Sequence, residues 1–69
     1  MTELPVAPVM RIIRKSGAER VSSDAGELLS ELMEAYGVKI TREAIKLASH
    51  AGRKTVTKDD VRMAAEILS

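Results

Sequence analysis

The chain has 69 residues, and a domain of this size has only a marginal hydrophobic core of its own. It contains no cysteine, which excludes disulfide bonds and cysteine metal sites. Its formal net charge is only +1, and no stretch provides the roughly 20 apolar residues of a membrane span or the basic start and apolar segment of a signal peptide. We therefore expect a small cytoplasmic protein that gains stability by oligomerisation.

The first predicted element is a short helix over about residues 4–15, which Gly17 ends. Pro5 suits the first turn of a helix, whereas Pro8 either bends the start or marks the true beginning. Apolar residues recur along one side at spacings of three and four: Val6, Val9 and Ile13. Basic residues occupy the other side: Arg11, Arg14 and Lys15.

The second predicted element is a long helix over about residues 22–51, with Ser22 or Ser23 as its N-cap and Asp24 in its first turn. Gly37 invites a break, but the apolar row keeps its phase through that position. The row consists of Leu29, Met33, Tyr36, Ile40, Ala44, Leu47 and Ala51, widened by Ala25, Leu28 and Leu32. Two short helices cannot cover so long a row, so we expect an obligate homodimer in which the long helices cross.

The third predicted element is a helix over about residues 57–68, entered through a short loop. Gly52 can take the positive φ that closes the preceding helix, and Thr57 is placed to cap the next one with Asp60 as its capping-box partner. The expected buried side of this helix is Val61, Ala64, Ala65 and Leu68. The loop itself offers two cations, a hydroxyl and backbone N–H groups beside a helix start, a combination that suits a phosphate: Arg53, Lys54 and Thr55.

The charges are distributed unevenly along the chain. Residues 1–20 carry four Lys or Arg against two Asp or Glu, and residues 52–58 carry three against none. Residues 21–51 carry three against five, and residues 59–69 carry one against three. This distribution predicts a basic face on an otherwise acidic body.

Several blocks of sequence, in order, resemble the archaeal histones, and together they span nearly the whole chain. They lie at residues 3–9, at Arg11-Ile12-Ile13-Arg14-Lys15, at residues 17–22 and 43–48, and at His50-Ala51-Gly52-Arg53-Lys54-Thr55-Val56. The resemblance implies one all-α histone-fold domain over residues 1–69, built as short helix, loop, long helix, loop and short helix, which forms an intertwined homodimer. It also implies an architectural protein of the nucleoid that wraps and compacts double-stranded DNA with little sequence specificity, as dimers that assemble further into tetramers or filaments.

The resemblance assigns DNA contacts to residues of this chain. In the family, the first loop of one subunit lies beside the second loop of the other, which would bring Arg20 near Lys54 and Thr55 of the partner subunit. Arg11 and Arg20 would approach the minor groove, and Lys54 and Thr55 would hold phosphates. Looser phosphate contacts are expected from Arg14, Lys15 and Lys58. The alternative for Arg11 and Arg20 is that they are ordinary exposed charges.

Two further roles concern structure and assembly. Arg53 stands seven residues before Asp60 and can fold across the loop to its carboxylate, a pair that the family uses as a structural clamp, with DNA contact as its minor role. The resemblance also implies a contact between dimers formed by Leu47, His50, Asp60 and Met63. Alternatively, His50 simply ends its helix, where an imidazole suits the helix dipole. A metal role for His50 is not expected, because the chain offers no second nitrogen or sulfur ligand.

Departures from the family leave other interpretations open. Positions 26, 35 and 49 carry Gly, Ala and Ser where longer polar side chains are common in relatives, which argues against contacts between successive DNA turns, with Glu31 and Arg62 left as a candidate pair. A second hypothesis is a histone-fold subunit whose dimer surface recruits proteins rather than DNA. An enzyme is a remote third, because Glu27, Glu31 and Glu34 share one solvated helix face without a pocket. We expect no cofactor and no small-molecule substrate.

Overall fold

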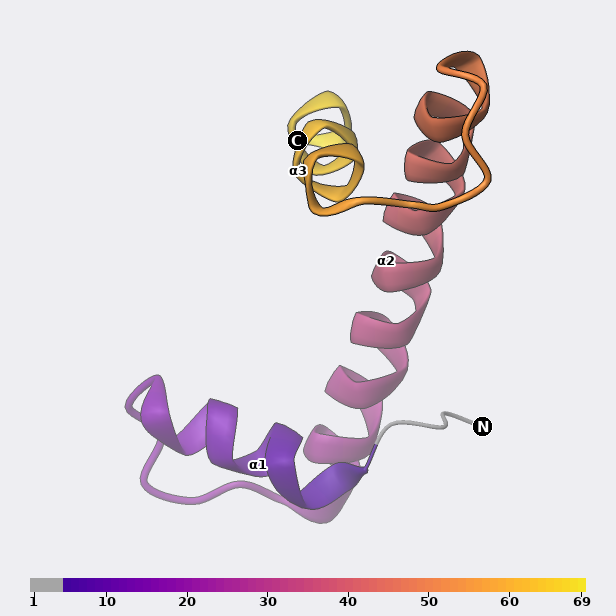
Figure 1. Ribbon diagram of the computed structural model, residues 1–69. Helices are drawn as coiled ribbons and strands as arrows, with labels where there is room; N and C mark the ends of the chain where they lie inside the picture. The colour runs from indigo at the N-terminus through magenta and orange to yellow at the C-terminus, as the bar shows by residue number, and fades with distance from the viewer. Residues whose placement is uncertain (1–4) are drawn as a thin grey trace. The chain divides into compact units, whose positions relative to one another are not determined.

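A computed structural model describes residues 5–69 as three helices: α1 (Val6–Lys15), α2 (Ser23–His50) and α3 (Lys58–Leu68) (Figure 1). Over this range the structure contains no strand, and the expected all-α arrangement of short, long and short helices is confirmed. The sequence placed these helices at about residues 4–15, 22–51 and 57–68. The expected start of the first helix at Leu4 lies outside the described residues.

Helix α1 begins without a capping side chain. Pro5 precedes it in an extended conformation, with φ −63° and ψ 135°. Pro8 falls in the first turn, where a missing N–H breaks no hydrogen bond because the first four N–H groups of a helix have no intrahelical acceptor. Pro8 therefore does not mark the beginning of the helix. At the other end, Gly17 takes a φ of +117° and its N–H donates to the Arg14 carbonyl at 2.9 Å.

Helix α2 runs through 28 residues without a break at Gly37, as its apolar spacing predicts. Ser22 is the residue that caps it, since its Oγ accepts a hydrogen bond from the Ala25 N–H at 3.3 Å. The helix closes in a Schellman arrangement around Gly52, whose φ is +73°. There the Arg53 N–H donates to the Ala48 carbonyl and the Gly52 N–H to the Ser49 carbonyl, both at 2.9 Å.

The chain divides into two compact units, which meet within α2 between Ala35 and Tyr36. In the first unit, α1 lies beside the N-terminal half of α2 (Figure 1), and Val9, Gly26 and Ser30 are buried. In the second unit, α3 lies beside the C-terminal half of α2. Its buried residues are Ala44, Ala48, Asp60 and Ala64.

Two details of the single chain differ from what the sequence indicated. Val61 was expected on the buried side of α3, but it is 44% exposed in the single chain. Gly26 was noted only as a departure from the longer polar side chains of relatives, and the structure buries it. A Cβ added there would lie 2.8 Å from Cγ of Met10, so a longer side chain has no room at position 26 unless Met10 or α1 shifts.

Large apolar side chains along α2 stay exposed in the single chain. Leu28 is 56% exposed, Leu32 57% and Tyr36 49%. Their spacing of four residues puts them on one side of the helix. An uncovered apolar row of this kind marks an interaction surface. None of the three helices combines the length and the apolar character that crossing a bilayer requires, over the part of the chain that the structure describes.

Candidate nucleic-acid interface

The loop between α2 and α3 is organised by one ion pair. Arg53 donates from one terminal nitrogen to Oδ2 of Asp60 and from the other to Oδ1, both at 2.8 Å. The first of these nitrogens also donates to the carbonyl of Thr55 at 3.0 Å. The guanidinium thereby ties the middle of the loop to the start of α3. The expected structural clamp of Arg53 and Asp60 thus has the geometry of a two-pronged pair, which fixes orientation as well as distance.

Asp60 also completes the cap of α3. Its Oδ2 accepts from the Thr57 N–H at 2.8 Å and from the Thr57 hydroxyl at 3.0 Å, while the Thr57 Oγ1 accepts from the Asp60 N–H at 3.3 Å. This is the capping box expected from the spacing of the two residues. One carboxylate therefore begins the helix and anchors the loop that precedes it.

The charges of the clamp stabilise one another. The hydrogen bonds from the Arg53 side chain, and next the one from the Thr57 backbone, hold the pKa of the Asp60 carboxyl well below its usual range. The same contact with Asp60 raises the pKa of Arg53. The Asp60 side chain is 4% exposed and that of Arg53 is 40% exposed, so the pair is partly shielded from water and salt. The ion pair therefore holds the loop conformation at every pH at which Asp60 is ionised.

Lys54 and Thr55 are the loop residues whose side chains carry a cation or a hydroxyl without taking part in the clamp or the cap. Both are exposed, and neither side chain takes part in a hydrogen bond or ion pair within residues 5–69. Over the same range, no hydrogen bond uses the backbone N–H of either residue. An ammonium group, a hydroxyl and two N–H donors are therefore available together on a loop of fixed shape. This combination suits a phosphate oxygen, as the sequence indicated.

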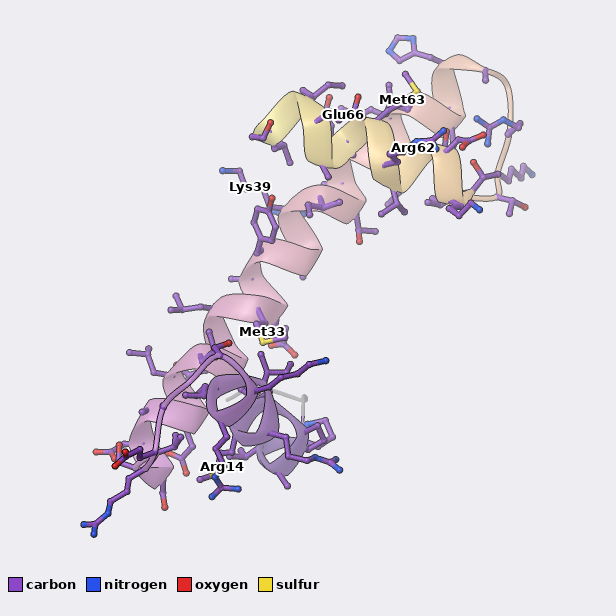
Figure 2. The ribbon with its side chains drawn as sticks, turned by 90° about the vertical axis from the view of Figure 1, so that its left-hand side faces the viewer. Arg14, Met33, Lys39, Arg62, Met63 and Glu66 are labelled. Carbon is purple, nitrogen blue, oxygen red and sulfur yellow. The ribbon has the colours of Figure 1, made fainter. Side chains whose placement is uncertain are left out.

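The basic residues of the first unit are exposed as well. Arg11, Arg14 and Lys15 lie on α1, and Arg14 extends away from the ribbon in Figure 2. Arg20 is exposed in the loop between α1 and α2. In the second unit, Lys58 is the first residue of α3 and is also exposed. These side chains are accessible to a polyanion, whereas Arg53 is committed to Asp60.

The residues expected between dimers differ in accessibility. His50 is exposed, Met63 is 48% exposed and projects from α3 (Figure 2), and Leu47 is half-buried. Asp60 is 3% exposed, and within the described residues its Oδ1 accepts only from Arg53. His50 also lines a surface hollow of about 290 Å³ with Ile45, Lys46 and Ser49.

Other charged residues lie on α2 and α3, and some of them form ion pairs within one helix. Arg62 pairs with Asp59 in the same helix at 2.6 Å, and Lys46 with Glu43 at 3.7 Å. Glu27 and Glu31 are exposed on α2 and Glu34 is half-buried. No three His, Cys, Asp or Glu side chains gather where they could hold a metal ion, as far as residues 5–69 are concerned.

Sequence reasoning missed two contacts that shape the interface. The Thr55 carbonyl anchors the Arg53 side chain, whereas the sequence drew attention only to the Thr55 hydroxyl. The meeting of Gly26 with Met10 was not expected at all. The available signal was a glycine inside a helix, which is unfavourable without a local reason.

The chain is similar to known proteins over almost its entire length. A family model described as histone-like transcription factor (CBF/NF-Y) and archaeal histone matches residues 2–65. A subunit of the archaeal histone HAN1 from Thermococcus zilligii is 53% identical over 66 residues, which cover 96% of this chain and 98% of that protein. Probable archaeal histone 3 of Methanocaldococcus jannaschii is 50% identical over 64 residues, covering 93% and 96%. The B-9 subunit of nuclear transcription factor Y from Arabidopsis thaliana is 35% identical over 60 residues, which cover 84% of this chain but 25% of that protein.

Proposed function

Because the chain belongs to the family of archaeal histones and histone-like CBF/NF-Y factors, we propose that it is an architectural protein that binds and wraps duplex DNA. The family consists of structural DNA-binding proteins rather than enzymes. Its binding is dominated by phosphate contacts, so sequence preference reflects how easily the DNA bends.

The observation that carries this function is the clamped loop before α3. The contacts of Arg53 with Asp60 and Thr55 hold the loop backbone, while Lys54 and Thr55 stay exposed with unused N–H donors. A preordered set of donors loses little conformational entropy when a phosphate binds. We assign phosphate contacts to Lys54 and Thr55 and secondary contacts to Lys58. Arg53 acts mainly by holding the loop.

Arg11 and Arg20 are the side chains that we assign to the minor groove, with Arg14 and Lys15 on neighbouring phosphates. All four are exposed, and none forms an ion pair within the described residues. Unpaired arginines suit a narrow minor groove, where the negative potential is strongest.

The protein acts as a homodimer, as archaeal histones do. The exposed row of Leu28, Leu32 and Tyr36 on α2 supports this assignment, since a second copy would remove these side chains from water. In the proposed dimer, the loop at residues 16–22 of one subunit lies beside the loop at residues 52–57 of the other. Each dimer then offers two such loop pairs to DNA.

Further assembly is proposed through Leu47, His50, Asp60 and Met63. Met63 and His50 provide accessible surface, and Leu47 adds apolar area. Asp60 contributes through Oδ1, because a carboxylate oxygen can accept a second hydrogen bond without releasing Arg53. Such contacts would join dimers into tetramers or longer filaments on the nucleoid DNA.

Titration with a duplex at several salt concentrations tests the function. The protein should bind the duplex at low salt. The logarithm of the association constant should then fall linearly with the logarithm of the salt concentration, with a slope near −0.9 for each phosphate contacted. If the protein failed to bind duplex DNA even at low salt, the competing hypothesis of a histone-fold subunit that recruits proteins would replace this one.

A further inference from the structure

Gly26 is buried where α1 lies against α2, and the space that a side chain at position 26 would fill is occupied by side chains of α1. A Cβ built on Gly26 would lie 2.8 Å from Cγ and 3.5 Å from Sδ of Met10, and 3.2 Å from Cγ1 of Val6. The shortest of these distances is closer than carbon atoms pack, so an alanine at this position would have to displace α1 or the Met10 side chain near its root. Ser30, one turn further along α2, is also small and fully buried.

The same helix carries basic residues on its far side. Val6, Val9 and Met10 are buried or half-buried, whereas Arg11 and Lys15 are exposed. At 3.6 residues per turn, Arg11 and Lys15 share one side of α1 and the residues that meet α2 share another. Because Arg11 belongs to α1, the distance between α1 and α2 decides where the Arg11 side chain stands relative to the rest of the first unit.

We propose that Gly26 is a positioning residue for DNA binding: by receiving Met10, it seats α1 at the depth from which Arg11 reaches the minor groove and its basic neighbours on α1 reach the adjoining phosphates. The inference rests on the proposed function and adds to it the residue that sets the position of α1 relative to the DNA. Gly26 itself touches no DNA. Charge-assisted hydrogen bonds form only over a narrow range of distance, so an outward shift of α1 removes the Arg11 contact instead of weakening every contact equally.

The test compares four variants of the full chain with the wild type: Gly26→Ala, Met10→Ala, the double variant Gly26→Ala/Met10→Ala, and the control Gly37→Ala. The control makes the same substitution in the same helix at a position where nothing lies within 4 Å of the new Cβ. Helicity and mass are measured first by circular dichroism and sedimentation. Duplex DNA affinity is then measured over a range of salt concentrations, because the salt slope counts phosphate contacts and a loss of folding stability alone does not change it.

We expect Gly26→Ala to remain a folded dimer, to bind DNA several-fold more weakly and to lose about one unit of salt slope for each phosphate released. The double variant should recover the wild-type slope, and Gly37→Ala should bind as the wild type does. A Gly26→Ala variant with wild-type affinity and slope would overturn the proposal, and so would a double variant that binds no better than Gly26→Ala.

The remaining outcomes are also decisive. If Gly26→Ala does not fold, the double variant is compared with Met10→Ala, and equal affinity and slope support the proposal. A double variant that stays unfolded, or binds more weakly than Met10→Ala, overturns it, because the obstruction would then not lie at Met10. A wild type that binds no duplex at low salt would instead refute the proposed function, which separates the two failures.

Discussion

Arg53 and Asp60 meet through two hydrogen bonds of 2.8 Å, although seven residues separate them in the chain. The same carboxylate caps α3 through Thr57, and the same guanidinium holds the Thr55 carbonyl. The pair therefore links the shape of the loop to the start of the helix. Substitution of either residue should therefore disturb both the loop conformation and the N-terminus of α3.

Asp60→Asn should lower the thermal unfolding midpoint of the dimer in a pH-dependent way. The folded-state pKa of Asp60 lies below its ordinary value of 3.8, so its stabilisation is present above about pH 4 and is lost as the pH falls through the folded-state pKa. The difference between wild type and variant should stay constant from pH 7 to pH 5 and shrink below pH 4. Calorimetry at fixed protein concentration measures it.

Asp59→Asn is the matched control for this experiment. Asp59 also pairs with an arginine, Arg62, but its side chain is 68% exposed and exposed pairs contribute little. The control should change the midpoint much less than Asp60→Asn does. An equal loss from both variants, or a loss from Asp60→Asn that does not depend on pH, would contradict the role of the clamp.

Lys54→Glu should weaken duplex binding at least tenfold at moderate salt, because it removes one phosphate contact per subunit while adding repulsion. The salt slope should fall by about one for each phosphate that is no longer neutralised. Fluorescence anisotropy with a labelled duplex measures both quantities. Arg42→Glu makes the same kind of charge change at an exposed position of α2 outside the proposed interface, and it should have a smaller effect. Equal effects would show that only net charge matters.

Gly37→Ala should stabilise the protein by about 1 kcal/mol per subunit, since alanine favours a helix interior and the new Cβ meets nothing within 4 Å. Urea unfolding at a fixed concentration measures the gain. A destabilised variant would mean that a second copy covers this position closely, which the single chain does not show.

Leu47→Glu and His50→Glu should stop assembly beyond dimers while leaving the dimer intact. A charge placed on the proposed contact face would be buried without a partner in each larger assembly. Light scattering of the protein with and without DNA reports the change. Wild-type assembly in both variants would refute the proposed interface.

Local features of this fold were predictable from the sequence because their determinants lie close together in the chain. The spacing of Thr57 and Asp60 predicts the capping box, and the apolar phase across Gly37 predicts one long helix, and both are present. The pairing of Arg53 with Asp60 also follows from a spacing of seven residues across a short loop.

Other features depend on which side chains meet in space. The sequence pattern assigned Gly26 no packing partner, whereas the structure sets Met10 of another helix against it. Val61 is likewise 44% exposed in the single chain, and the helical period alone does not tell whether α2 or a second copy covers it. The assignments of Arg11, Arg20 and Lys54 to DNA remain predictions, since they concern a ligand and a second copy of the chain.

Native mass spectrometry of the protein mixed with a short duplex is the most direct test of the central claim. Two copies joined along the exposed row of α2 should present their basic loops together, so the DNA-bound species should carry two copies or multiples of two. The free protein should be a dimer at micromolar concentration. A folded single copy, free or bound to the duplex, or a dimer that leaves the duplex unbound at low salt, would contradict the account.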